Sequence, residues 1–118
     1  MNWYLVKMVF GIKTLKTQAV TQFDEQVRLV SARNENEAFL KARLIGVREE
    51  ELSLNDTNSE VCWEFIDVSE LSHFEMNDGV EIASVIKEVD HADSYKQFIY
   101  QKASRIGEKT GSSVAADY

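Results

Sequence analysis

The sequence contains no proline and a single cysteine among its 118 residues. Without proline there can be no polyproline ligand, no Pro-rich linker and no turn built on a cis-prolyl bond. One cysteine, Cys62, cannot form a disulfide within the chain or a zinc site made of several cysteines. Because disulfides belong to oxidising environments, this cysteine usage is compatible with a reducing compartment.

Long apolar runs are also missing. The apolar stretch at residues 3–10 is interrupted by Lys7 and is not preceded by a positively charged region. It is therefore neither a signal peptide nor a membrane span, and no later segment has membrane-spanning character. We expect a cytoplasmic protein without a membrane partner.

Basic residues are outnumbered, since 13 Lys and Arg face 20 Asp and Glu for a net charge of −7. Non-specific nucleic-acid binding needs Lys and Arg to neutralise phosphates, so we predict no nucleic-acid partner. Residues 1–33 and 94–118 carry +3 and +2, whereas residues 34–60 and 61–93 carry −4 and −8. This acidic centre favours a negative face that docks a basic protein partner, and the alternative is an ordinary solvated surface.

Hydrophobic patterning predicts four strands and two helices. Residues 3–10 are almost continuously apolar, and residues 23–32 alternate apolar and polar side chains, as in a strand with one solvent-exposed face. Residues 61–68 are predicted as a third strand with apolar side chains on both faces, and residues 80–89 as a fourth strand with Val80, Ile82 and Ile86 in phase. The tripeptide at residues 77–79, Asn-Asp-Gly, predicts a turn before the fourth strand. Helical spacing predicts one helix capped by Asn34 or Asn36 and stopped by Gly46, and another from Asp90 or Asp93 to residue 106.

The element order predicts an α+β fold, ββα-ββα, with a four-stranded mostly antiparallel sheet and two helices packed on one face. We expect one domain over residues 1–107 and a flexible C-terminal tail over residues 108–118. The other face of so small a sheet stays partly open. Such a face favours self-association, so a homodimer is expected.

Five stretches together resemble a known family. Their order and spacing are similar to those of the family called domain of unknown function 4288, whose members are small, uncharacterised bacterial proteins, and the resemblance covers about residues 1–106. It implies no catalytic residue, ligand or partner. The stretches are residues 3–8 (WYLVKM), 22–29 (QFDEQVRL), 36–42 (NEAFLKA) followed by Gly46, 63–71 (WEFIDVSEL) and 78–84 (DGVEIAS).

Candidate chemistry centres on Glu64, which lies between Trp63 and Phe65 in an apolar strand. Desolvation there would raise the pKa of the carboxyl, which is one way to make a general acid. The alternative is a cross-strand ion pair with Lys7 or Arg28. The nucleotide and hydrolase signatures are absent, and no motif indicates a cofactor or a dedicated metal site.

The leading hypothesis is a non-catalytic protein-interaction module, of which an antitoxin or immunity-type inhibitor is one form. The sequence leaves catalysis undecided, and a second hypothesis is a small-ligand or metal-dependent enzyme centred on Glu64, Asp67, His73 and Glu81. A third is a structural or regulatory homodimer. The residues expected to bind a basic partner are Glu64, Asp67, Glu70, Asp78 and Glu81.

Overall fold

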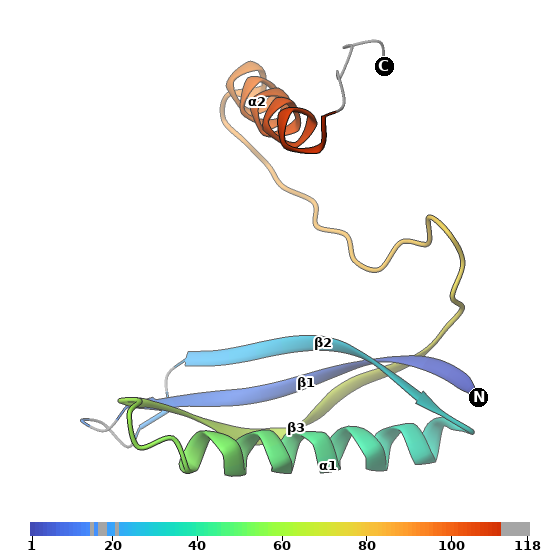
Figure 1. Ribbon diagram of the computed structural model, residues 1–118, viewed down its shortest axis with the longest axis vertical. Helices are drawn as coiled ribbons and strands as arrows, with labels where there is room; N and C mark the ends of the chain where they lie inside the picture. Colours follow the sequence, from blue (N-terminus) through green and yellow to red (C-terminus); the bar gives the residue numbers. More distant parts are fainter. Residues whose placement is uncertain (15, 17–18, 21, 112–118) are drawn as a thin grey trace. The chain divides into compact units, whose positions relative to one another are not determined.

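The computed structural model describes residues 1–14, 16, 19–20 and 22–111. The chain forms two compact units, Met1–Val80 and Glu81–Tyr118. Within these described residues, the first unit holds three strands and one helix, and the second holds the other helix (Figure 1). In chain order the elements are β1 (Asn2–Thr14), β2 (Gln22–Ala32), α1 (Glu35–Leu54), β3 (Val61–Phe74) and α2 (Ala92–Thr110).

The first unit is built on an antiparallel sheet with the strand order β2-β1-β3. The central strand β1 pairs with β2 so that Asn2 lies opposite Ala32 and Ile12 opposite Gln22. It pairs with β3 from Trp3 opposite Phe74 to Thr14 opposite Val61, with two register shifts. The α+β class is therefore confirmed, with a sheet of three strands.

The core lies between this sheet and α1, which Figure 1 shows along one face of the sheet. Side chains alternate between the faces of a strand, and the even-numbered residues of β1 from Tyr4 to Phe10 are buried. Ala38 and Ala42 of α1 are fully buried in the same cluster. Small residues at these positions let the helix approach the sheet closely.

The predicted four-stranded ββα-ββα sheet is wrong, because the predicted fourth strand at residues 80–89 forms neither strand nor helix. The turn before it does form: Gly79 has a φ of 80°, and the Val80 N–H donates to the Asn77 carbonyl at 3.1 Å. Alternation shows only that a segment suits a half-buried sheet, whereas pairing and packing with neighbouring strands stabilise it. Val85 and Ile86 in this segment are exposed.

Helix α1 begins as predicted but ends later. The Asn34 side chain accepts a hydrogen bond from the Glu37 N–H at 2.9 Å, which satisfies one of the free donors of the first turn. The helix then continues through Gly46 to Leu54, so the predicted stop at Gly46 is wrong. Gly46 is buried against Phe65, and this close approach explains the glycine better than a helix end does.

Helix α2 runs to Thr110 and ends at Gly111, whose φ of 73° is a left-handed helix cap. The predicted end at residue 106 is wrong, because Gly107, the glycine that follows it, lies within the helix. No described helix is long and apolar enough to cross a membrane. The predicted domain boundaries, residues 1–107 with a tail at 108–118, stay a prediction, and residues 112–118 of that tail lie outside the described part of the chain.

Candidate functional site

Polar side chains face α1 along the first half of β2. Asp24, Gln26 and Arg28 share the side of the strand that carries the buried residues Val30 and Ala32 further on. The alternation along β2 did indicate one exposed face, but the exposed face is the one that bears Phe23, Val27 and Leu29. The polar side of β2 is half-buried beside the helix.

A groove of about 370 Å³ opens between this half of β2 and the C-terminal half of α1. The volume lies within the usual range of small ligand sites. Residues from the three strands, from α1 and from the connection that follows α1 contribute to its walls. They are Phe10, Asp24, Gln26, Arg28, Glu49, Leu52, Ser53, Asp56 and Trp63.

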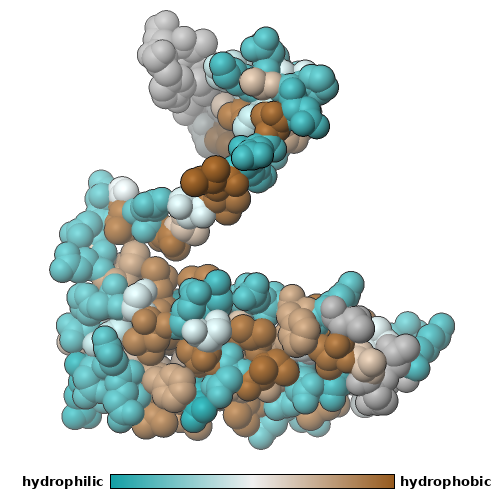
Figure 2. Space-filling view, turned by 180° about the vertical axis from the view of Figure 1, so that it is seen from behind, coloured by the Kyte–Doolittle hydropathy of each residue, from teal (hydrophilic) through white to brown (hydrophobic). Residues whose placement is uncertain are grey.

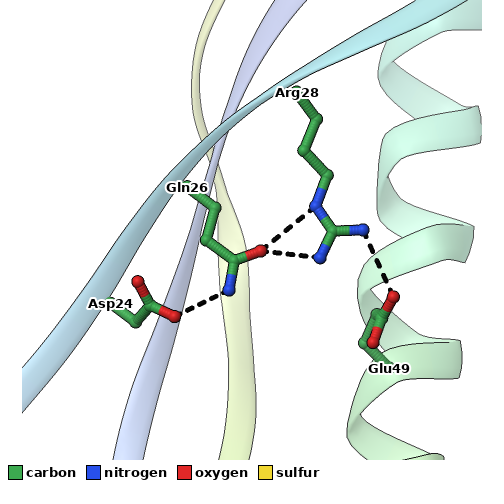
Figure 3. A network of polar contacts seen from close by, with 4 residues as sticks. All are labelled: Asp24, Gln26, Arg28 and Glu49. Carbon is green, nitrogen blue, oxygen red and sulfur yellow. Dashed lines mark hydrogen bonds and ion pairs between the residues drawn. The ribbon is translucent and has the colours of Figure 1, made fainter. Parts of the chain in front are cut away.

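Four of these side chains form a continuous network from β2 to α1 (Figure 3). Gln26 Nε2 donates to Asp24 Oδ2 at 2.6 Å, and Gln26 Oε1 accepts from Arg28 Nη2 at 2.6 Å and from Nε at 3.1 Å. Arg28 Nη1 then meets Glu49 Oε1 of α1 at 3.2 Å. The network holds the two carboxylates at opposite ends of one chain of hydrogen bonds.

Trp63 of β3 closes another side of the groove. Its indole Nε1–H donates to Asp24 Oδ2 at 3.1 Å, and its backbone N–H donates to Ser53 Oγ of α1 at 2.8 Å. The second bond ties β3 to the helix beside the groove. The indole therefore has a fixed orientation and forms an aromatic wall next to the Asp24 carboxylate.

The lining of the groove is acidic. Among the described residues that line it, the formal charges are the carboxylates of Asp24, Glu49 and Asp56 and the guanidinium of Arg28, a net charge of −2. An ionised carboxylate has two oxygens and about four acceptor positions, more than the network uses. A groove rich in acceptors with an aromatic wall suits a cation that carries N–H donors.

Three of the five carboxylates predicted to dock a partner already have cations of this chain beside them. Glu64 pairs with Lys13 at 3.2 Å, Glu70 with Lys7 at 3.5 Å, and Asp67 with Arg43 at 2.7 Å. A cross-strand pair for Glu64 was one of the two interpretations, although its partner is Lys13. The other two predicted residues, Asp78 and Glu81, are exposed and belong to different units.

The pair of Asp67 and Arg43 is the most strongly coupled of the three. Arg43 donates from Nε and Nη2 to both carboxylate oxygens, and the Val68 N–H also donates to Oδ1 at 2.8 Å. These donors, the guanidinium first, lower the pKa of the Asp67 carboxyl to about 2. The same hydrogen bond raises the pKa of Arg43. The Asp67 carboxyl therefore stays ionised at neutral pH, and its ion pair with Arg43 joins α1 to the edge strand β3.

The residues of the enzyme hypothesis do not all meet. Glu64 and His73 are nine positions apart on β3, which corresponds to roughly 30 Å along a strand. His73 packs edge-on against the Tyr4 ring with the centroids 5.6 Å apart. Among the described residues no cluster of three His, Cys, Asp or Glu could hold a metal ion.

The polar residues of the groove were not identified from the sequence. Their signal was present, because Asp24, Gln26 and Arg28 follow one another at every second position. That spacing is equally typical of a solvated strand face, and Glu49 and Trp63 join them only through the fold. The groove could have been recognised from the fact that these three polar residues lie on the same side of the strand as the apolar residues Val30 and Ala32.

Comparison with known proteins identifies a family for the chain. No curated protein and no solved structure matches the chain. A family model does match, over residues 3–84, so the match is shorter than the expected residues 1–106 and leaves α2 outside it. The matched part includes β1, β2, α1 and β3, and hence every residue of the groove. The chain belongs to the family described as Domain of unknown function (DUF4288).

Proposed function

We propose that the protein is a non-catalytic binding module whose groove between β2 and α1 accepts a basic side chain of a protein partner. One observation carries this proposal: in the described part of the chain, three carboxylates and an indole line a groove to which one cation, Arg28, belongs. The guanidinium of an arginine fits best, since it offers five N–H donors and stacks on aromatic rings. The acidic balance of the chain supports the same kind of partner through electrostatic steering.

The contacts favour binding over catalysis. Arg28 is held by Gln26 and Glu49, and Asp24 accepts from both Gln26 and Trp63, so the lining is already organised before any ligand enters. A preorganised lining lowers the entropy lost on binding. Each hydrogen bond from a guanidinium to a carboxylate is worth about 1.5–3 kcal/mol.

A peptide titration tests the proposal. The labelled full-length chain is titrated with a short glycine peptide that has a central arginine, and with the same peptide carrying citrulline, which has the shape of arginine without its charge. We expect the arginine peptide to shift the indole N–H resonance of Trp63 and to bind at least about tenfold more tightly than the citrulline peptide. The indole of Trp3, which lies on the other face of the sheet, serves as an internal control.

Two variants of α1 complete the test. Glu49→Gln keeps an acceptor for Arg28 but removes one charge of the groove, so we expect weaker binding of the arginine peptide. Glu51→Gln, on the same helix but outside the groove lining, should bind like the wild-type chain. Equal binding of the two peptides, or equal binding by Glu49→Gln and the wild type, would refute the proposal.

A further inference from the structure

The face of the sheet opposite α1 exposes large apolar side chains. On β2, Phe23 is 58% exposed, Val27 52% and Leu29 38%. Trp3 of β1 is 38% exposed, and Ile66 of β3 is 48% exposed. These five residues define the apolar sheet face. Figure 2 shows apolar side chains (brown) reaching the surface between polar ones (teal) on the side of the Met1–Val80 unit that it draws. Large exposed apolar patches are typical of interaction sites on proteins.

The size of this face suits contact with an equal face. Three strands spaced by about 4.8 Å and about eleven residues long give a plan area of roughly 500 Å². Two such faces in contact remove roughly 1,000 Å² from water, the size at which specific interfaces begin. Two sheets that stack in this way form a sandwich with a core about 10 Å thick.

The charges favour a second copy over an oppositely charged partner. By register, two cations and four carboxylates share this side of the sheet, and one of the four, Asp67, pairs with Arg43 of α1. With that pair counted as neutral, the formal charge of this side is −1 in a chain of −7. Two of the carboxylates pair with the two cations, in the ion pairs of Glu70 with Lys7 and of Glu64 with Lys13. Copies of an acidic chain repel each other least through a surface that is nearly neutral. The remaining carboxylate on this side is Glu25, which forms no ion pair with the residues that the structure describes.

We propose that the apolar sheet face is the interface of a symmetric homodimer. The two-fold arrangement that brings β2 of one protomer over β2 of its partner keeps the most apolar strands together. It also runs the two β2 strands in opposite directions, which places the Trp3 end of one sheet over the Phe23 end of the other. Val27, at the middle of β2, then lies near the axis, close to its own counterpart.

A charge-swap experiment tests the dimer with the full-length chain. We expect the wild type to sediment at twice the 13.5 kDa monomer mass. Val27→Glu and Val27→Lys should each raise the dimer dissociation constant at least about 100-fold, because a symmetric interface contains every substitution twice. An equimolar mixture of the two variants should form a heterodimer, since opposite charges then face each other.

The mixture also shows that the variants are folded, because unfolded chains would not pair. Leu44→Glu is the matched control: Leu44 is 71% exposed on α1, on the opposite side of the sheet, and its substitution should leave the dimer intact. A wild type that stays monomeric at all concentrations would overturn the proposal. So would a dimer that tolerates Val27→Glu, or a mixture of folded variants that stays monomeric.

Discussion

Replacing Gly46 by alanine should destabilise the protein although alanine is the better helix former. A Cβ atom built at Gly46 would lie well inside van der Waals contact of three carbons of the Phe65 ring, with Cζ at 2.5 Å. The ring has little room to withdraw, because it packs on the Phe10 ring with the centroids 5.4 Å apart and Phe10 is only 1% exposed. The added methyl therefore has to displace the core or move the helix.

The magnitude follows from two opposing effects. Overpacking a core costs about 1–3 kcal/mol, and a contact this close belongs at the upper end. Replacing glycine by alanine within a helix stabilises the helix by about 1 kcal/mol. We expect a net loss of about 2 kcal/mol in the free energy of unfolding, measured by urea denaturation followed by circular dichroism.

A second background separates the two effects. In a Phe65→Ala chain the ring is gone, so Gly46→Ala should raise stability by up to about 1 kcal/mol through helix propensity alone. The sign of the effect should therefore reverse between the two backgrounds. A Gly46→Ala chain as stable as the wild type, or a loss of the same size in both backgrounds, would refute the close contact between α1 and β3.

Two further predictions concern the N-terminal end of α1 and the ion pair that joins α1 to β3. Asn34→Ala removes the acceptor for the Glu37 N–H and should lower the free energy of unfolding by about 1 kcal/mol in urea titrations, whereas Asn34→Asp should retain most of it. The Asp67 carboxyl should titrate near pH 2 by NMR, and Arg43→Gln should raise its pKa towards the ordinary value of about 3.9, although the Val68 N–H keeps it below that value. Because the folded pKa is lowered, the stabilisation from this pair is complete above about pH 4 and is lost as the pH falls towards 2. A carboxyl that titrates near 4 in the wild type would contradict the pairing.

Local patterns predicted the elements that local chemistry specifies. The strands expected at residues 3–10, 23–32 and 61–68 lie within β1, β2 and β3, and the cap at Asn34 was one of two expected alternatives. The glycine at position 46 was misread, because a glycine that ends a helix and one that admits a neighbouring ring look alike in sequence. Only the position of Phe65 distinguishes them.

Features that depend on distant partners could not be predicted in the same way. Residues 80–89 have the alternation of a strand, but the sheet of the described chain ends at β3. The groove joins Asp24, Glu49 and Trp63, which are separated by 25 and 14 positions and meet only in the fold. Which side of β2 faces α1 was equally undetermined, since an alternating strand is compatible with burial of either side.

The central position of β1 has a consequence for folding. Its pairing with β2 joins residues 10 to 30 positions apart, whereas its pairing with β3 joins residues 47 to 71 positions apart. Closing the longer loop costs more chain entropy, so the β1–β2 hairpin can form while β3 is still unpaired. Until β3 arrives, β1 presents a free edge of backbone donors and acceptors along its whole length. Aggregation during folding should therefore start at that edge, and a peptide with the sequence of β3 should suppress it.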